Sequence, residues 1–364
     1  MKKRISQAEI ARAVGLSQRA VSKALRDEPD ISTDTKARVT AAAAALGYSP
    51  NRIAASLVSG STSILGVVFP GFGGQYFSRL FHSMEESVRK AEYSLLLRGW
   101  DWHTVSDETD INALLQFRVD GLLVVPRTTV PWSESVYPEL IKAGNKIVFI
   151  DHFVDVEGAC SVVPDNRQGA RDATHHLLSL NRGPVAMVNV DLPFSTSANE
   201  REEGFREALK QAGIADAQTH VIKVPSHPYS ELLSAELGKK LNDYQAIFCY
   251  SDDVALNIIE ILEAIGLSVP EDVAVAGFGD NIPHVERLRV PLTTVSQNPA
   301  TMASTAVAML LKRLNSQEVP PRITVPTRLT VRASTDLNAS SRHIQRRSLS
   351  PSLTQHTRDA MKRP

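Results

Sequence analysis

From residue 64 onward, short apolar runs of strand length alternate with stretches of helical periodicity, and this alternation limits the possible folds more than any other feature. Strands that are apolar on both faces need cover on both faces, and helices between them allow the strands to run parallel. The sequence therefore predicts an α/β architecture with parallel sheets. The strand runs are ILGVVFP, YSLLLRGW, DGLLVVP, KIVFID, PVAMVNV, AIFCYSD and VAVAGFGD, and the helical stretches include 76–91, 199–212 and 253–265.

The α/β pattern extends over about 270 residues, which is too much for one small sheet. We therefore expect a core of residues 63–335 made of two doubly wound lobes. The first lobe should contain about 63–163 plus 297–324, and the second about 164–296 plus 325–335. PLTTVSQNP and RITVPTRLTVRAST are expected to be late crossings that join the lobes.

Residues 1–48 have a different character, because short helical segments follow one another there. Ser6 and Glu9 have the spacing of a capping box. Gly15 is placed to end the first helix in a left-handed conformation, and Ser17 can cap the second helix. Two helices joined by a turn that contains glycine are typical of a helix-turn-helix unit, in which the second helix enters the major groove of DNA.

A third helix is expected from near Ser32 to Gly47. Apolar residues at helical spacing predict one small core shared by the three helices. These residues are Ile10, Val14, Leu16, Val21, Leu25, Val39 and Leu46.

The second helix of this unit, within residues 15–25, has two unlike faces. At 100° per residue, its polar and basic side chains fall within an arc of about 140° and its apolar side chains fill the opposite arc. The polar arc holds Gln18, Arg19, Ser22, Lys23 and Arg26, and the apolar arc holds Ala20, Val21, Ala24 and Leu25. We therefore expect one face to pack on a core and the other to contact an anionic partner.

The net charge is zero, but the charges are unevenly distributed. Residues 1–60 contain ten Lys or Arg against five Asp or Glu, and residues 336–364 contain six against two, which leaves −9 for the middle. Basic ends on an acidic body suit a protein whose ends meet a polyanion. Residues 49–62 read as a hinge helix and linker, too short to be helical without a partner. The tail, 336–364, is rich in Ser and Arg and is expected to be disordered.

Several other classes of protein are disfavoured. No apolar run reaches the roughly 18 residues of a membrane span, and the N-terminal residues lack the apolar stretch of a signal peptide, which predicts a cytoplasmic protein. Cys160 and Cys249 lie in apolar runs and are expected to be buried free thiols. We find neither a nucleophile with a base nor a cofactor loop, so we expect no enzyme activity, no cofactor and no metal.

Three local patterns could also be read as a dinucleotide site, a metal site or a catalytic carboxylate pair, and we disfavour each of these interpretations. GFGG at 71–74 lacks the third glycine and the acidic partner of a dinucleotide site. His175 and His176 are adjacent on a helix and point to different faces, which makes them a poor metal pair. Asp252 and Asp253 lie where a strand leads into a helix, so we expect helix capping before any catalytic role.

Six motifs occur in the order found in one family: EIARAVGLSQRAVSKAL, LGYSPNRIAASL, RVDGLLVVP, VVPDNRQGA, REEGFREAL and VAGFGDN followed by PLTTV. With them, residues 4–335 closely resemble the LacI/GalR family of bacterial transcription regulators. The resemblance implies a periplasmic-binding-protein-like core that binds a small effector, often a sugar, between its lobes. It also implies a homodimer that presents two headpieces to double-stranded operator DNA with an inverted repeat.

The resemblance also assigns a DNA-binding set. Gln18, Arg19 and Lys23 stand where the family reads bases, and Leu57 stands where a hinge leucine enters the minor groove. Lys23 departs from the usual Arg, and RDEPD departs from the usual segment after the second helix, which affects the phosphate contact expected at Arg26. The full set is Ser6, Gln7, Ser17, Gln18, Arg19, Ser22, Lys23, Arg26, Asn51, Arg52, Ala54 and Leu57.

For the core, ligands of open α/β sheets lie beyond the carboxyl ends of the strands. This rule selects a set of polar and aromatic residues, with His152 beside Asp151. Within the set, the resemblance best supports Tyr76, Phe77, Asp151, Arg201, Ser251 and Asp280. Aromatic rings together with Asp and Arg suit a polyol. The set is Tyr76, Phe77, Trp100, Asp101, Arg127, Asp151, Asp165, Ser197, Arg201, Ser251 and Asp280. Ser251 replaces a common Asn and Gly279 a common Asp, which leaves the sugar open.

These features favour a repressor of genes for carbohydrate uptake or catabolism, controlled by a sugar or sugar derivative. A solute-binding protein of a transport or sensing system would share the two lobes, but it would need an export signal and no headpiece. A regulator that acts as an activator would have the same sequence features, because the sign of control depends on where the operator lies.

Overall fold

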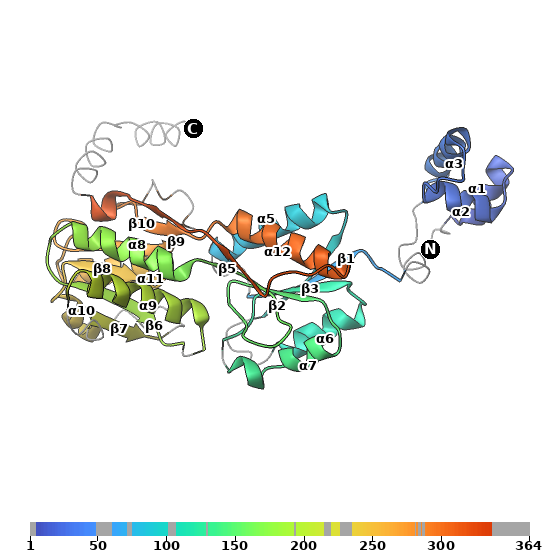
Figure 1. Ribbon diagram of the computed structural model, residues 1–364. Helices are drawn as coiled ribbons and strands as arrows, with labels where there is room; N and C mark the ends of the chain where they lie inside the picture. Colours follow the sequence, from blue (N-terminus) through green and yellow to red (C-terminus); the bar gives the residue numbers. More distant parts are fainter. Residues whose placement is uncertain are drawn as a thin grey trace, which may run out of the picture. The chain divides into compact units, whose positions relative to one another are not determined.

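The computed structural model describes residues 5–48, 60–70, 75–100, 107–128, 130–192, 194–214, 220–225, 235–280, 282, 285 and 288–336. The chain divides into two compact units, residues 1–62 and 63–364, and each has its own hydrophobic core (Figure 1). Residues 49–59 of the expected hinge and 337–364 of the expected tail lie outside the described residues. No helix among those described is long and apolar enough to cross a lipid bilayer.

The first unit, called the headpiece below, contains three helices: α1 (Gln7–Val14), α2 (Gln18–Leu25) and α3 (Thr33–Ala45). The local signals for their ends are confirmed. Gly15 has φ 70° after α1, and Ser17 Oγ accepts a 3.1 Å hydrogen bond from the Ala20 N–H. The capping box of α1 is present, and Glu9 Oε2 accepts from both the N–H (2.7 Å) and the hydroxyl of Ser6.

The headpiece core contains Ile10, Ala11, Val21, Ala24, Val39 and Ala43. Three of the other predicted residues, Val14, Leu16 and Leu25, are partly buried and pack against it. Tyr48, which the periodicity did not indicate, packs there too. The prediction was wrong for Leu46, which is 39% exposed. This residue is the C-cap that ends α3, so it lies past the last position that faces the core.

The first lobe has a six-stranded parallel sheet in the order β11-β5-β4-β3-β1-β2. Its strands are β1 (Ile64–Pro70), β2 (Ser94–Trp100), β3 (Gly121–Val124), β4 (Ile147–Ile150), β5 (Ser161–Pro164) and β11 (Arg322–Val325). Its helices are α5 (Gln75–Lys90), α6 (Glu108–Gln116), α7 (Tyr137–Lys142) and α12 (Pro299–Leu314), with a short 3-10 helix η1 (Trp132–Glu134). Helices α5 and α12 cover one face, and α6 and α7 cover the other (Figure 1).

The second lobe has a six-stranded sheet in the order β12-β10-β9-β8-β6-β7. Its strands are β6 (Val185–Val190), β7 (Val221–Val224), β8 (Ala246–Cys249), β9 (Ala274–Gly279), β10 (Thr293–Ser296) and β12 (Arg328–Thr330). Its helices are α8 (Asn166–Ser179), α9 (Thr196–Gln211), α10 (Ala235–Leu241) and α11 (Asp252–Ala264), with a 3-10 helix η5 (Ala333–Thr335). Helices α8 and α9 cover one face, and α10 and α11 the other.

Buried side chains alternate between the two faces of each sheet, as expected for strands. Met187 packs under α8 and α9, whereas the next residue, Val188, packs under α10 and α11. The expectation of parallel pairing needs one change, because β12 pairs with β10 in the antiparallel direction. The two-lobed α/β prediction is confirmed.

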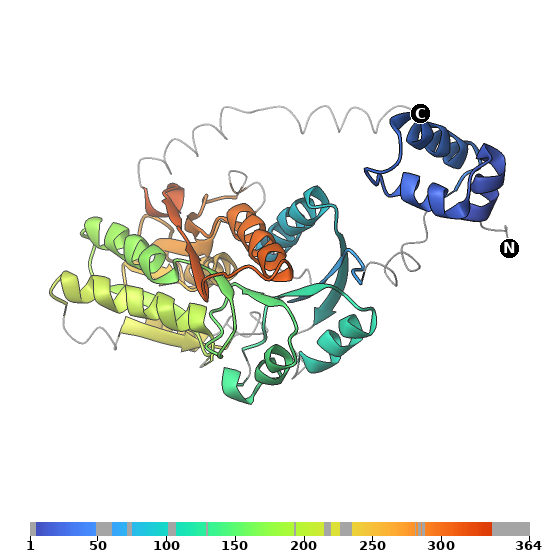
Figure 2. The same cartoon turned by 45° about the vertical axis from the view of Figure 1, so that its right-hand side comes forward.

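The chain passes between the lobes at three places: between β5 and α8, between β10 and α12, and between β11 and β12. Figure 2 shows the segment with β11 and β12 running from one lobe into the other. All three crossings lie near carboxyl ends of strands in the first sheet or in β10, so strand-end loops of both lobes are brought together.

Candidate nucleic-acid interface and interlobe site

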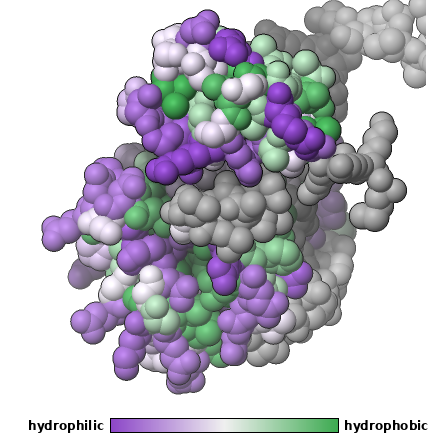
Figure 3. All heavy atoms as spheres, turned by 90° about the vertical axis from the view of Figure 1, so that its right-hand side faces the viewer, coloured by the Kyte–Doolittle hydropathy of each residue, from purple (hydrophilic) through white to green (hydrophobic). Residues whose placement is uncertain are grey.

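Helix α2 of the headpiece has the two faces that its sequence indicates. Gln18, Arg19 and Arg26 are exposed, whereas Val21 and Ala24 are buried in the small core. In Figure 3 hydrophilic residues are interspersed with hydrophobic ones over the headpiece surface that faces the viewer. Because the apolar residues of α2 are used in the core, its opposite face is available for a polar or anionic partner.

Three other predicted headpiece residues lie at the starts of helices, whereas Ser22 lies within α2. Ser6 and Ser17 are the N-caps of α1 and α2, and Gln7 is the first residue of α1. Backbone N–H groups at a helix N-terminus favour anions such as phosphate. The structure therefore combines two helix starts with one basic helix face. Asn51, Arg52, Ala54 and Leu57 lie outside the described residues.

Two of the basic side chains on α2 are paired with acidic residues of the following turn. The Lys23 ammonium contacts the Asp30 carboxylate and lies 3.6 Å from Glu28, and Arg26 Nη2 lies 2.9 Å from Glu28 Oε1. The hydrogen bond with Asp30 raises the pKa of Lys23, and the same bond lowers the pKa of Asp30. The sequence showed the unusual RDEPD segment, but it did not show which charges meet.

In the core, Tyr76 of α5 and Asp151 after β4 form a buried pair. The Tyr76 hydroxyl donates a 2.6 Å hydrogen bond to Asp151 Oδ1, and both residues are 6% exposed. Burial raises the pKa of Tyr76 well above its ordinary value, and the Asp151 charge raises it further. Phe77 is partly buried beside them, with its ring centroid 5.0 Å from that of Tyr76. The structure thus brings together three residues that the strand-end rule selects.

Arg201 of α9 is buried in a polar and aromatic cage. Its Nε donates to Asn166 Oδ1 (3.0 Å), its Nη1 to the Tyr250 carbonyl (2.7 Å) and its Nη2 to Gln297 Oε1 (3.3 Å). The guanidinium carbon lies 3.8 Å from the ring centroid of Phe278 and 4.7 Å from that of Tyr250. A guanidinium has five N–H donors, so this cage fixes its plane and leaves two donors beyond the three used here.

The sequence did not indicate the three residues that accept hydrogen bonds from Arg201. Asn166 lies two residues after the end of β5, Tyr250 directly follows β8, and Gln297 directly follows β10. The same strand-end rule selects them, but Asp165 and Ser251 were chosen in their place. Asp165 Oδ1 accepts from the Gln168 N–H and Ser251 Oγ from the Val254 N–H, so both act as helix N-caps.

Groups from both lobes act on one another at these strand ends. The charge of Arg201 opposes the rise in the Tyr76 pKa that burial causes. The same charge adds to the lowering of the His152 pKa by burial. The Phe153 N–H donates a 3.1 Å hydrogen bond to Thr196 Oγ1, which lies 3.4 Å from His152 Nδ1. We call Tyr76, Asp151, His152, Arg201 and Tyr250 the interlobe cluster. Ser197 borders it, with Oγ 3.4 Å from the Tyr250 hydroxyl.

Arg127, which the strand-end rule also selects, is held by carboxylates of its own lobe. Its Nη1 lies 2.5 Å from Asp107 Oδ1 and its Nη2 3.0 Å from Asp110 Oδ2, and its side chain is 3% exposed. The hydroxyl of Tyr137 also donates to Asp107. Burial raises the pKa of Asp107, and these hydrogen bonds and the Arg127 charge oppose that rise. Arg127 therefore stabilises a buried network in the first lobe.

Asp280 is likewise paired, and it also joins the lobes. Its Oδ1 lies 2.6 Å from Arg332 Nη2, while its backbone carbonyl accepts a 2.5 Å hydrogen bond from Arg79 of α5. One oxygen of its carboxylate is paired with Arg332. Because the side chain is partly exposed, a ligand can still reach it. Asp101 and the side chain of Trp100 lie outside the described residues.

The disfavoured alternatives can be compared with the structure where it is described. His175 Nε2 lies 2.9 Å from Gln211 Oε1, whereas His176 Nε2 lies 2.8 Å from Thr335 Oγ1, so the two rings do point to different partners. The expectation that Asp252 or Asp253 caps α11 was wrong, because Ser251 is the cap. Asp252 is instead buried and accepts a hydrogen bond from Thr294. Residues 71–74 lie outside the described residues.

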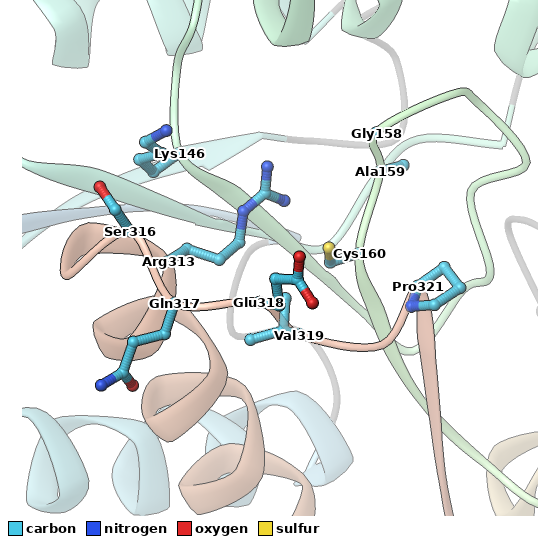
Figure 4. Close-up of a pocket in the computed structure, with 10 residues that line it drawn as sticks. All are labelled: Lys146, Gly158, Ala159, Cys160, Arg313, Ser316, Gln317, Glu318, Val319 and Pro321. Atoms are coloured by element: carbon cyan, nitrogen blue, oxygen red, sulfur yellow. The ribbon is translucent and has the colours of Figure 1, made fainter.

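A pocket of about 450 Å³ lies at the opposite, amino ends of β4, β5 and β11 (Figure 4). Lys146, Arg313 and Cys160 line it, and Arg313 Nη1 donates a 2.8 Å hydrogen bond to the Ile147 carbonyl. Cys160 and Cys249 are buried free thiols, which confirms the prediction for both. Among the described residues, no group of three or more His, Cys, Asp or Glu side chains could hold a metal ion.

Comparison with known proteins gives two family matches. Residues 8–51 match the model described as "Bacterial regulatory proteins, lacI family", and residues 174–335 match the model described as "Periplasmic binding protein-like domain". HTH-type transcriptional regulator RegA of Clostridium saccharobutylicum is 29% identical over 337 residues, which cover 90% of this chain and 98% of that protein.

Two solved structures extend the comparison to the fold. A complex of the transcriptional regulator CelR with cellobiose has 26% sequence identity and a TM-score of 0.67, and it covers 91% of this chain and 100% of that chain. A lac repressor dimer bound to operator and the anti-inducer ONPF has 23% identity and a TM-score of 0.79, with 92% and 99% covered. The latter supports the fold of both units.

Proposed function

This chain belongs to the LacI family of DNA-binding transcriptional regulators, and on that premise we propose that it is a repressor controlled by a carbohydrate-derived effector. The genes it controls would serve carbohydrate uptake or catabolism. The effector would bind at the interlobe cluster and change operator binding through the relative arrangement of the lobes. Such a protein acts where operator DNA is found, in the cytoplasm.

The proposed DNA surface is the exposed face of α2 with the starts of α1 and α2. Gln18, Arg19 and Lys23 would read base edges in the major groove, while Ser6, Gln7, Ser17, Ser22 and Arg26 would contact phosphates. A homodimer would place two such surfaces on an inverted repeat with half-sites about one helical turn apart. Leu57, with Asn51, Arg52 and Ala54, would enter the minor groove from the hinge.

The observation that carries the effector proposal is the cage around Arg201. A buried guanidinium with three donors committed and its plane fixed by Phe278 is pre-organised for a small polar ligand. Tyr76 and Asp151, whose pair lies within electrostatic reach of Arg201, supply a hydroxyl, a carboxylate and an aromatic ring. Rings that cover C–H groups and charged groups that bind hydroxyls together suit a sugar or sugar acid. The cellobiose bound to CelR supports this class of ligand.

Two titrations test this proposal. The operator is first recovered by the full-length protein from a randomised duplex library, and a panel of mono- and disaccharides and sugar acids is screened by calorimetry. Arg201→Ala should then lose about tenfold to hundredfold in affinity for the sugar that binds, since a charged hydrogen bond contributes about 1.5–3 kcal/mol. Its affinity for the recovered operator, measured by fluorescence anisotropy without sugar, should stay nearly intact.

Arg167→Ala is the matched control, because its guanidinium is on the same lobe but is 54% exposed. It should respond to the sugar as the wild type does. If Arg201→Ala still responds at the wild-type sugar concentration, the effector does not bind at the interlobe cluster. If the wild type enriches no duplex, the assignment as a DNA-binding repressor is wrong.

A further inference from the structure

The turn after the proposed recognition helix carries three carboxylates in four residues, Asp27, Glu28 and Asp30. We call residues 27–30 the acidic turn. Lys23 contacts both Asp30 and Glu28, while Arg26 contacts Glu28. Asp27 makes a separate 2.7 Å ion pair with Lys36 of α3, which anchors the turn to the headpiece. The acidic turn is therefore part of the headpiece surface that α2 presents.

The contacts of Lys23 restrict a side chain that is normally free. A lysine ammonium has three N–H donors on a flexible four-carbon stem. The hydrogen bond to Asp30 and the Glu28 carboxylate 3.6 Å away give the ammonium a preferred direction and leave at least one donor for a further acceptor. The Lys23 side chain is 26% exposed, so this donor can still reach solvent or a ligand.

The same carboxylates change the electrostatics of the DNA-facing surface. Of the three basic residues in the polar arc of α2, Lys23 and Arg26 are paired with the acidic turn. Non-specific DNA affinity comes almost entirely from cations near phosphates, and a carboxylate beside them reduces it. The Asp30 side chain is 53% exposed, so it would repel a phosphate that approaches Lys23. A base acceptor in the groove carries no full negative charge and would be repelled less.

We propose that Asp30 is a positioning residue that determines operator specificity: it directs Lys23 towards a base acceptor and withholds it from the phosphate backbone. This inference rests on the proposed function, because it requires that α2 reads DNA. It assigns the RDEPD departure a role, since a lysine in place of arginine lacks the planar fork that would orient itself on guanine. The acidic turn supplies that orientation.

The test compares three variants of the full-length protein on two DNA probes. One probe is the duplex that the wild type enriches from a randomised library, and the other is a scrambled duplex of the same composition. Asp30→Asn frees Lys23 for a phosphate, so it should bind the scrambled duplex more tightly, with a log–log salt slope steeper by about 0.9 for each headpiece that contacts the duplex. Its preference at one base pair of each half-site should fall about fivefold, the lower range for one base contact.

Two variants separate positioning from a general effect of charge or folding. Asp34→Asn removes one negative charge from an exposed position in the first turn of α3, and it should leave the base preference unchanged. Asp30→Glu keeps the carboxylate and should restore both the salt slope and the base preference. A headpiece that is merely unfolded by Asp30→Asn would lose affinity for both probes.

The outcomes are distinguishable. If Asp30→Asn behaves as Asp34→Asn does on both probes, or loses affinity for both, Asp30 does not position Lys23. If the wild type enriches no duplex at all, the proposed function fails and this inference fails with it. A steeper salt slope together with relaxed base preference, rescued by Asp30→Glu, supports the inference.

Discussion

The hydroxyl of Tyr76 donates a 2.6 Å hydrogen bond to Asp151, which joins the first turn of α5 to the residue after β4. Asp151 has φ 75°, a left-handed conformation that non-glycine residues seldom adopt. Both residues are buried at the carboxyl end of the first sheet. The pair therefore holds an uncommon backbone conformation in place at the edge where the lobes meet.

Removing this hydrogen bond should weaken the core. Tyr76→Phe keeps the ring but leaves the buried Asp151 without this donor, so the free energy of unfolding should fall by about 1–3 kcal/mol. Urea unfolding followed by circular dichroism measures the change. Tyr93→Phe removes a hydroxyl from a less buried position and should change stability by less than about 0.5 kcal/mol. Equal effects for both variants would contradict the role given to the pair.

The stability of the core should fall at acidic pH, in part because of His152. Burial lowers the pKa of His152 below 6.5, while the charge of Asp151 acts in the opposite direction. Because the folded-state pKa is below the unfolded one, the contribution to stability is present above about pH 6.5 and is lost as the pH falls through the folded pKa. Burial lowers the pKa of His176 in the same sense.

Thermal unfolding between about pH 7.5 and pH 5 tests this linkage. His152→Asn should show a smaller fall in melting temperature over that range than the wild type does. His82→Asn, at an exposed position on α5, should leave the profile of the wild type unchanged. A His152→Asn profile parallel to that of the wild type would show that His152 is accessible to protons in the folded core.

The two thiols should react at different rates with Ellman's reagent. Burial raises the pKa of both Cys160 and Cys249, so neither should react quickly in the folded protein. Cys160 is 7% exposed and lines the pocket beside Arg313, whereas Cys249 is 0% exposed under α11. Cys160 should therefore react first, and Cys249 at the rate of unfolding. Cys160→Ser identifies each phase, and a fast phase that persists in this variant would contradict the assignment.

The packing of α8 on α9 depends on Gly204. A Cβ atom at this position would lie 2.2 Å from the backbone carbonyl oxygen of Arg167, which has no freedom to rotate away. Gly204→Ala should therefore force the helices apart and cost about 1–3 kcal/mol of stability. Gly99→Ala is the control, since a Cβ there meets nothing within 4 Å. Urea midpoints that agree for the two variants would show that α8 and α9 separate at little cost.

The ends and faces of the helices, and the strands between them, could be predicted because they depend on near neighbours. Gly15 ends α1 and Ser17 caps α2 through groups within one helical turn, and the apolar runs become buried strands because each must be covered on both faces. Where that local rule was extended past the end of a helix, as for Leu46, it failed. The family match in both units follows from the same local motifs.

The sequence by itself determined the three-helix headpiece, the two α/β lobes and the strand ends at which a ligand would be sought. Only the tertiary structure decided which polar side chains meet there. Arg127 is drawn into carboxylates of its own lobe, while Arg201 is held by Asn166, Tyr250 and Gln297. The partners of Arg201 lie 35 to 96 residues away along the chain. The order of the strands and the crossings between the lobes determine which of these distant residues meet. No periodicity in the sequence encodes that order.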